Sequence, residues 1–560
     1  MSHYQAVLTY HQQTKHHVTE GFAAAPHTLD WQAQPCAFRQ YSNTYYYELP
    51  LTAQRIHAPY EVLHGRINCR PRALNTDSIA SLLELSLGLS AWKQFESQRW
   101  PLRCHPSSGN LHPVEGYLVT PDLVGLPAGV YHYNSHNHDL VQRGRFDVKC
   151  AETFAEALPA DTFLIGLTII PWRESWKYGE RAFRYCHHDV GHVMASIRYA
   201  ASCLGWEVVM LSHWADDETR QVLGLHRHED FHTHEEEYPA LMLWVTTQPH
   251  KHTPRKNPNM CTMGGSGLLR ALHNIHWYGK AEKLSLHHDY HWQMIDDIIQ
   301  ATEKPVTHTP QFLQQKYPFI SPLVKNSSYD GARQLIHQRR SAQCFDAHTQ
   351  LADTDFYTLL DYLLPRQHLS PWSVFPSPSC LHLVFFVHRV TGLESGVYIL
   401  IRDKTEKEYV QAQLHPHFNW QRPKNCPHSL AFYQLSAHNN IVETHILNCY
   451  QDIASDGIFT ITMLAKFEQI LYREAWRYKH LFWEAGLIGQ VLYLQAEQLG
   501  LRGTGIGCYF DDMLHDFLGI KNMSYQSIYH FSVGGALEDK RLHTLAPYAH
   551  LNQAENKNKP

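Results

Sequence analysis

The 560-residue chain lacks the features that mark several protein classes. No window approaches 18 uninterrupted apolar residues, and the first residues hold no apolar run of signal-peptide length. Its 12 cysteines include no CxxC pair, which argues against a zinc ribbon or a dense disulfide framework. Only 18% of residues are charged, and the net charge of −5 gives no signature of nucleic-acid binding. We expect a soluble, cytoplasmic protein with reduced thiols and with neither nucleic-acid nor membrane partners.

The hydrophobic fraction of 44% is that of a globular protein, and the length suggests two to four domains. Histidine is abundant, with 43 residues against 48 lysines and arginines together. His188 and His192 have the i,i+4 spacing of zinc ligands, but a zinc peptidase needs glutamate where Asp189 stands. The His-rich stretch 226–237 could bind a metal adventitiously, although a solvated loop fits it better. We expect no metal site.

An internal repeat organises the chain. Four features of the first half recur in the second at a constant displacement of 295 residues: Gly191 and Gly486, Leu204-Gly205 and Leu499-Gly500, Asp216-Asp217 and Asp511-Asp512, and Leu223-Gly224 and Leu518-Gly519. An earlier block pairs PSSGNLHPV (106–114) with PSPSCLHLV (376–384), and each is followed by Gly-Val-Tyr. So many ordered matches indicate two copies of one unit.

Each copy predicts the same order of elements. A helix (77–89; 353–364) precedes the PS loop and a strand (116–120; 383–390), then a Gly-Val-Tyr hairpin and a long helix ending at Leu-Gly. A short strand (207–211; 505–510), a helix begun by Asp-Asp and a last strand (240–247; 528–535) follow. The predicted fold is α+β, with an arm (1–50), a first domain (51–250), a structured connector (251–330) with a helix near 292–302, a second domain (331–545) and a polar tail (546–560).

The two copies differ where chemistry would be placed. Arg339-Arg340-Ser341 precedes the first helix of the second copy, and the first copy has no counterpart. Ser108 and Asn110 of the first copy's loop align with Pro378 and Cys380 of the second. A site between the copies can therefore draw RRS from one and PSSGN from the other, whereas the opposite site lacks both. The asymmetry predicts one functional site per chain.

These elements suit a phosphorylated, flat heterocyclic cofactor. Paired arginines and a serine can bind a phosphate, and an asparagine amide can bind a ring edge through both of its polar atoms. The glycine run 503–507 lets backbone approach a ring or a phosphate. Each signal alone is weak, since RRS also fits a solvated charged stretch and PSSGN an ordinary turn. GxGxG after a helix is not a dinucleotide-binding fingerprint.

At this point the chain resembles the flavin-dependent nitroreductase superfamily, in particular its SagB-type, or azoline dehydrogenase, branch. The resemblance rests on the motifs YHQQTKH, LDWQAQP, RCHPSSGNLHPVEGYLV, GVYHY, RAFRYCHHDVGH, RRSAQCFD, AWRY and EAGLIGQVLYLQAEQLGLRGTGIGCYFDD. It implies an α+β fold with FMN between two nitroreductase units, which here would form an intramolecular pseudo-dimer. Association beyond that pseudo-dimer is left open.

The resemblance also implies site residues. The expected FMN-binding residues are Arg339, Arg340, Ser341 and Gln343 of the second copy, Pro106, Ser107, Ser108 and Asn110 of the first, and Glu484, Gly486, Gly505, Ile506, Gly507, Lys540 and Arg541. Gln343 departs from the pattern, because such proteins often have lysine or arginine there. Phosphate binding is then expected to depend more on Arg339 and Lys540.

In azoline-oxidising members of the branch, a Lys-Tyr pair serves as the base while hydride goes to the flavin. Lys177-Tyr178 matches this pair, and 477–479 is the second-copy analogue. A surface lysine beside a packing tyrosine explains the pair equally well, because a lysine acts as a base only when its pKa is lowered.

The preferred hypothesis is an FMN-dependent dehydrogenase or oxidase acting on a peptide or a smaller amino-acid-derived molecule. The alternatives are an NAD(P)H-dependent nitro- or quinone-type reductase and a non-catalytic tandem scaffold of a biosynthetic complex.

Overall fold

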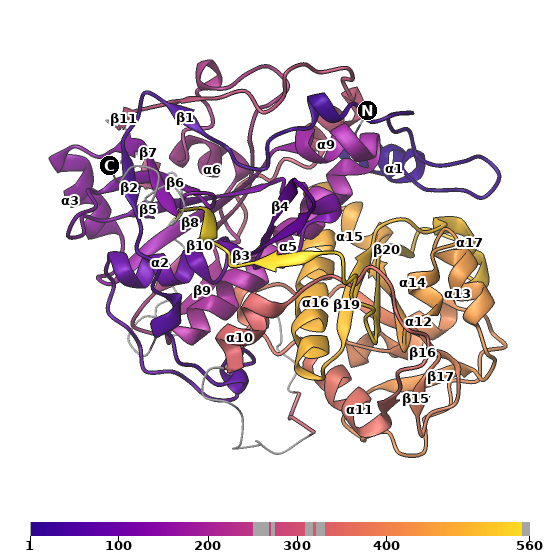
Figure 1. The fold of residues 1–560 in the computed structure, drawn as a ribbon. Helices are drawn as coiled ribbons and strands as arrows, with labels where there is room; N and C mark the ends of the chain where they lie inside the picture. Colours follow the sequence, from indigo (N-terminus) through magenta and orange to yellow (C-terminus); the bar gives the residue numbers. More distant parts are fainter. Residues whose placement is uncertain (1, 250–267, 270–274, 309–316, 321–330, 552–560) are drawn as a thin grey trace.

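The computed structural model describes residues 2–249, 268–269, 275–308, 317–320 and 331–551. Two α+β halves lie side by side, and the two longest helices pack together at their junction (Figure 1). Residues 251–267, 270–274, 309–316 and 321–330 of the expected connector lie outside the described residues. Its expected helix is present as α9 (Gln293–Ala301).

The first half is built on an eight-stranded sheet in the order β11-β7-β6-β5-β8-β10-β9, with β2 also paired to β7. Its strands are β2 (Tyr46–Glu48), β5 (Val114–Thr120), β6 (Gly129–Asn134), β7 (Asp139–Arg145), β8 (Thr162–Ile169), β9 (Glu207–Met210), β10 (Tyr238–Thr246) and β11 (His276–Trp277). The surrounding helices are α2 (Thr76–Glu84), α3 (Val148–Ala157), α4 (Pro171–Tyr178), α5 (Ala182–Cys203) and α6 (Asp216–Val222). Strands β5 and β8 are buried along their whole length, as expected for strands with both faces covered.

The second half repeats this plan with a six-stranded sheet in the order β17-β16-β14-β18-β20-β19. Its strands are β14 (Leu381–Val387), β16 (Gly396–Leu400), β17 (Phe432–Ser436), β18 (Phe459–Lys466), β19 (Arg502–Ile506) and β20 (Tyr525–Gly534). Its helices are α10 (Gly331–Gln338), α11 (Asp353–Tyr362), α12 (Lys407–Gln413), α13 (Ile441–Leu447), α14 (Asp452–Ser455), α15 (Glu468–Leu471), α16 (Tyr478–Gln498) and α17 (Asp511–Leu518). The run β6-β5-β8-β10-β9 corresponds to β16-β14-β18-β20-β19, and every pairing in both runs is antiparallel. The expected tandem α+β fold is therefore correct.

The halves join through α5 and α16, which are buried along nearly their whole length. A Cβ atom at Gly191 would collide with the Trp483 carbonyl and Gly486, and one at Gly486 would collide with the His188 carbonyl and Gly191. Residues related by the 295-residue displacement therefore meet at one crossing point, where only glycine lets the two backbones approach this closely.

Two ion pairs between the halves follow the same symmetry. Arg184 on α5 binds Asp511 at the start of α17, with Nη1 to Oδ1 at 3.1 Å. Lys479 on α16 binds Asp216 at the start of α6. Each aspartate occupies a helix N-terminus, where the helix dipole also favours negative charge. The Asp-Asp repeat of the sequence thus marks contacts that hold the pseudo-dimer together.

Both ends of the chain cross to the opposite half. Helix α1 (His3–Gln13) packs on the second copy, where the His11 ring lies 3.1 Å from the Tyr478 hydroxyl. At the other end, β21 (His543–Leu545) pairs with β3 (Leu89–Phe95), which pairs with β4 (Gln98–Arg103) in the first half. The short pairs β1 (Tyr41–Ser42) with β12 (Lys280–Ala281) and β13 (Leu351–Ala352) with β15 (Val390–Thr391) complete the described strands.

Three expected boundaries differ from the structure. The first helix of copy one ends at Glu84, because Leu89 already begins β3. The strand expected over 505–510 is β19 at 502–506, so residues 507–510 form a connection. The expected polar tail is anchored at its start, since the buried Tyr548 accepts the backbone N–H of Leu89 at 3.1 Å.

Candidate functional site

Two adjoining hollows lie where the copies meet, and both are lined by Pro106, Ser107 and Ser341. We name the first, of about 250 Å³, the cationic end; it is lined by Lys93, Trp100, Leu102, Arg103, His105, Asn110, Arg339, Arg340, Ala342, Gln343, Arg502, Ala536, Leu537, Glu538, Asp539 and Leu542. We name the second, of about 350 Å³, the tyrosine end; it is lined by Ser108, Gly109, Tyr178, Tyr185, Asp189, His192, Gln451, Tyr493, Thr504, Gly505, Ile506, Gly507, Cys508 and Tyr529. RRS of the second copy and PSSGN of the first thus share one cavity.

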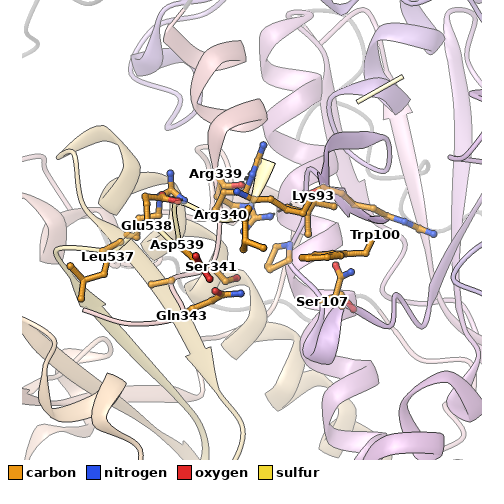
Figure 2. A pocket seen from close by; sticks show the side chains of 18 of the residues that line it. Lys93, Trp100, Ser107, Arg339, Arg340, Ser341, Gln343, Leu537, Glu538 and Asp539 are labelled. Atoms are coloured by element: carbon orange, nitrogen blue, oxygen red, sulfur yellow. Dashed lines mark hydrogen bonds and ion pairs between the residues drawn. The ribbon is translucent and has the colours of Figure 1, made fainter. Parts of the chain in front are cut away.

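Arg339 connects the two copies at the cationic end. Its Nε and Nη2 donate to the carbonyls of Cys104 and Arg103, at 3.1 and 3.2 Å, and its guanidinium lies 5.0 Å from the centre of the Tyr493 ring. Its Nη1 is buried without a hydrogen-bond partner. Figure 2 shows Arg339, Arg340 and Ser341 between the second-copy loop that carries Glu538 and the first-copy Trp100. One strong donor is therefore free for a ligand.

The cationic end holds more positive charge than its surroundings compensate. Burial and the neighbouring Arg339 lower the pKa of Arg340 to about 10. Burial lowers the pKa of Arg103 to about 10 and moves that of Arg339 in the same direction. Lys93 adds a further cationic group to the wall, and Arg502 adds another that is paired with Glu497 and Glu538, at 3.3 and 3.0 Å. An anion such as a phosphate would relieve this repulsion, so the donors fit a phosphorylated cofactor.

The loop that carries Ser107 and Asn110 is fixed from within. The Ser107 hydroxyl accepts the backbone N–H of His112 at 2.8 Å, and Asn110 lies in the left-handed region with φ of 59°. The Asn110 Nδ2 donates to the Pro101 carbonyl, and its Oδ1 contacts His112 Nε2, both at 3.0 Å. Each amide atom thus has one partner within the protein, which leaves one Nδ2 hydrogen and one Oδ1 lone pair for a ring edge.

Asp189 on α5 ties this loop to the pseudo-dimer junction. Its carboxylate accepts the backbone N–H and the hydroxyl of Ser108, both at 3.2 Å. Burial raises the pKa of Asp189 to about 7, although hydrogen bonds from Ser107 and Ser108 act in the opposite direction. Burial and the nearby Asp189 also raise the pKa of Glu174, whose two oxygens have no hydrogen-bond partner. A proton is therefore held close to the tyrosine end near neutral pH.

Tyr493 organises the second-copy wall. Its hydroxyl lies 2.9 Å from the Ser341 hydroxyl and accepts the Gly505 N–H at 3.1 Å. A Cβ atom at Gly505 would collide with Tyr529, and one at Gly507 would collide with Tyr185. The glycine run therefore lets aromatic side chains pack against β19 and the residues that follow it, while keeping Gly505, Ile506 and Gly507 on the cavity wall.

Of the expected catalytic pair, Tyr178 lines the tyrosine end and Lys177 does not. Lys177 Nζ lies 5.2 Å from the centre of the Tyr178 ring. Burial raises the pKa of Tyr178 well above its usual range, so the phenol stays protonated at neutral pH. In the second-copy analogue, Tyr478 is buried against α1 and Lys479 is paired with Asp216. The analogue has a structural role.

Four expected cofactor residues lie outside the cavity lining. Glu484 binds Ser379, the Cys380 N–H and Arg402 in the opposite, second-copy pocket. Gly486 belongs to the helix crossing, for the steric reason given above. Lys540 is exposed, and Arg541 is exposed and paired with Asp539 at 2.7 Å. Lys93, Arg103 and Arg502 supply positive charge on the lining instead. The expected dependence of phosphate binding on Lys540 stays a prediction that the lining does not support.

Sequence reasoning missed Asp189, although a signal was present. Asp189 and Glu484 are related by the 295-residue displacement, and Asp189 is the one that faces the PSSGN loop. Lys93, Trp100, Arg103, Tyr493 and Arg502 also line the cavity, although none of them was among the expected site residues. They come from separate elements, β3, β4, α16 and β19, that only the tertiary fold brings together.

The histidines carry structural bonds at the positions that suggested a metal. His188 Nε2 lies 3.0 Å from the Ile528 carbonyl, and His192 Nε2 lies 3.2 Å from the Tyr529 hydroxyl, so the two rings bind different partners. His192 lines the tyrosine end. In the stretch 226–237, Glu235 and Glu237 are buried, and Glu237 pairs with Arg39 at 3.1 Å. That stretch is therefore less solvated than expected.

The comparison with known families decides the identity of this fold. The nitroreductase family model matches residues 70–232 and 336–535, together more than half of the chain. The chain belongs to the nitroreductase family. Each match covers most of one copy, so this nitroreductase-family protein carries the family unit twice, and it is a flavin-dependent oxidoreductase by family. Among the described residues, no helix combines the length and the apolar character needed to cross a bilayer.

Individual relatives agree with this assignment. A Methanocaldococcus jannaschii protein named as a nitroreductase is 31% identical over 146 residues, covering 25% of this chain and 68% of its own. The trifolitoxin-processing protein TfxB of Rhizobium leguminosarum bv. trifolii is 28% identical over 233 residues, covering 36% of this chain and 62% of TfxB, less than two thirds of its length. A crystal structure of a nitroreductase-named protein from Anabaena variabilis matches 95% of this chain and 99% of its own, with a TM-score of 0.64 and 21% identity. It shares the fold.

Proposed function

We propose that this nitroreductase-family protein binds one FMN per chain in the joined cavity and oxidises an azoline-containing peptide or a related amino-acid-derived molecule. The observation that carries the proposal is the pairing, in one cavity between the copies, of a cationic end with a free Arg339 Nη1 and a tyrosine end that no lysine or arginine lines. Phosphate and flat ring would occupy these two ends respectively. The relationship to TfxB supports a peptide-derived substrate, because that protein is named for processing trifolitoxin.

The residues of the cationic end would hold the cofactor by its phosphate. Arg339 and Arg340 supply guanidinium donors from the segment after α10, and Ser341 is held by Tyr493 at the point where the two ends join. When bound, FMN supplies the hydride acceptor for the oxidation. The low charge of the tyrosine end would favour a planar ring there over a second anion.

Residues at the tyrosine end would bind the substrate and take part in removing its proton. Tyr178 is protonated at neutral pH and lines the cavity, so it can donate a hydrogen bond to the substrate. We propose that Lys177 and Tyr178 act together on the substrate proton, with Tyr178 in contact with the cavity and Lys177 lying against its ring. Asp189 and Glu174, buried behind the loop, would keep that region protonated.

Cofactor stoichiometry tests the binding proposal. Denatured holoprotein should release about one FMN per chain, because only one of the two pseudo-equivalent pockets has the RRS and PSSGN elements. A ratio near two would refute the asymmetry, and protein that stays colourless after reconstitution with FMN would favour the scaffold hypothesis.

Turnover tests the reaction. A model peptide with one thiazoline or oxazoline ring should lose two hydrogens in the presence of the holoprotein and air, detected by mass spectrometry. Under nitrogen, the same peptide should bleach the flavin absorbance in a single turnover. Rapid bleaching by NADPH with no effect of the peptide would instead support the reductase alternative.

A further inference from the structure

A pair of thiols lies at the edge of the tyrosine end and takes no part in the function proposed above. Cys508 lines the cavity directly after Gly507. Cys449 lies between α13 and α14, and the two thiols are within hydrogen-bonding contact of each other. Both side chains are only partly buried, and neither forms a disulfide. The pair therefore borders both the cavity and solvent.

Backbone contacts hold the two cysteines side by side. The Phe510 N–H donates to the Leu447 carbonyl at 2.9 Å, and Gln451 Nε2 donates to the Cys508 carbonyl at 2.9 Å. Cys449 itself adopts a left-handed backbone conformation with φ of 55°, which is uncommon for a residue with a Cβ atom. These contacts tie the two segments together on both sides of the thiols.

The surroundings favour the thiolate on Cys508. The hydrogen bond from Cys449 lowers the pKa of Cys508, and Arg181 acts in the same direction, although burial and the nearby Asp511 oppose both. The Arg181 guanidinium is fixed there by two bonds to the Gly507 carbonyl, at 2.9 and 3.2 Å. The Cys449 thiol has its pKa raised, as expected for the donor of the pair. Cys508 would therefore act as the attacking sulfur.

We propose that Cys449 and Cys508 form a dithiol–disulfide couple that carries electrons between the flavin and external disulfides. The inference rests on the proposed FMN site, because the tyrosine end, opposite the cationic end, is where the ring would lie. In one direction, the Cys449–Cys508 disulfide would take up two protons together with two electrons from bound, reduced FMN. The S–S bond would break and each sulfur would become a thiol.

The couple is then reset by thiol–disulfide exchange. The Cys508 thiolate attacks an external disulfide and releases one thiol, forming a mixed disulfide. Cys449 attacks that mixed disulfide, releases the second thiol and closes the internal bond. The external oxidant is thus a small disulfide, such as oxidised glutathione, and the dehydrogenase could turn over without oxygen.

Disulfide mapping tests the pair without reference to the flavin. Protein treated with oxidised glutathione under nitrogen should lose about 2 Da by formation of one internal disulfide, and a non-reducing digest should contain a Cys449–Cys508 cross-link. C449S and C508S should lack it, whereas the exposed control C36S should keep it. Absence of the cross-link in the wild-type chain overturns the proposal whether or not FMN binds.

Electron counting tests the relay. Anaerobic titration of the oxidised, FMN-loaded wild-type protein should consume about four electrons per chain, and C449S about two. C449S is the informative variant, because Cys449 does not line the cavity and its change should leave FMN content unaltered. A cross-link with only two electrons consumed overturns the relay. A cross-link in protein that never binds FMN would refute the proposed function and the relay, and would leave the pair as a surface redox site.

Discussion

The two halves place a carboxylate at the same position of their long helices and use it differently. Glu484 accepts the Cys380 N–H at 2.8 Å and is neutralised by the fully buried Arg402. Asp189 accepts the Ser108 N–H in the same manner, but no ion pair to it is found in the part of the chain that the structure describes. The second copy has turned this position into a structural salt bridge, whereas the first keeps a titratable acid beside an open cavity.

Other residues that line the proposed FMN cavity also differ from their counterparts at the opposite, pseudo-equivalent position, where ion pairs replace ligand-binding groups. Arg502 at the cationic end is related by the 295-residue displacement to Glu207, and Tyr493 is related to Arg198. Glu207 and Arg198 form an ion pair of 2.8 Å, so the positions that present positive charge and a phenol in one pocket satisfy each other in the opposite pocket. A duplicated unit can therefore lose one site without losing the fold, provided that each charged residue of the lost site gains a partner.

The largest expected effect comes from breaking the second-copy salt bridge. E484Q leaves Arg402 charged and buried without its carboxylate, which should lower the free energy of unfolding by about 3–5 kcal/mol. Urea unfolding followed by circular dichroism measures the loss. The matched variant D189N removes a carboxylate that has no cationic partner and should be destabilised far less at pH 7.5. Equal losses in the two variants would contradict the contrast between the copies.

The pH dependence of stability sharpens the same contrast. The folded-state pKa of Asp189 is about 7, against about 4 for an unfolded aspartate. Between these values, the folded chain holds a proton that the unfolded chain releases, so wild-type stability should fall relative to D189N as the pH rises from 4 to 7, by about 1.4 kcal/mol per pH unit. Above pH 7 the difference should stay constant. Parallel curves for both proteins would show that Asp189 is ionised throughout.

The third expected effect concerns the tyrosine end, which has no functional counterpart in the second copy. Y178F removes a protonated hydroxyl from the cavity wall and should slow flavin reduction by a model azoline peptide about a hundredfold. FMN content should change little, because the proposed phosphate contacts lie at the cationic end, which Tyr178 does not line. Stopped-flow absorbance under nitrogen measures the rate. A lower FMN content with an unchanged rate would assign Tyr178 to cofactor binding instead.

The internal repeat made much of this fold predictable from the sequence. It could not show which of two equivalent residues belongs to the site. The Gly191–Gly486 crossing and the two Asp-Asp helices follow directly from the constant displacement, because a repeated sequence must fold alike. The complementary presence of RRS and PSSGN predicted one shared cavity. The sequence did not indicate which of the two related carboxylates, Asp189 or Glu484, faces that cavity. Both residues occupy equivalent helical positions, and only the packing of the loops distinguishes them.

The sequence analysis expected part of the positive charge of the cationic end at other residues, for a related reason. Lys540 and Arg541 belong to the loop at 536–542, and the charged residues that this loop presents to the cavity are Glu538 and Asp539. Lys93 on β3 and Arg103 on β4 belong to the other copy. No local pattern predicts that a strand pair and a C-terminal loop from opposite copies will form one wall, which depends on the pairing of β21 with β3.

The smallest expected effect separates the arginines that line the cavity from those that do not. R339A removes a buried guanidinium with one free donor and should weaken FMN binding about tenfold, the value of one charge-assisted hydrogen bond. R541A removes a charge that is exposed and already paired with Asp539, so FMN affinity should change less than twofold, within the range of surface ion pairs. Fluorescence titration of apoprotein with FMN measures both, and R339K tests whether the forked geometry matters beyond charge. A stronger effect of R541A than of R339A would instead indicate that the phosphate binds near Arg541, as the resemblance implied.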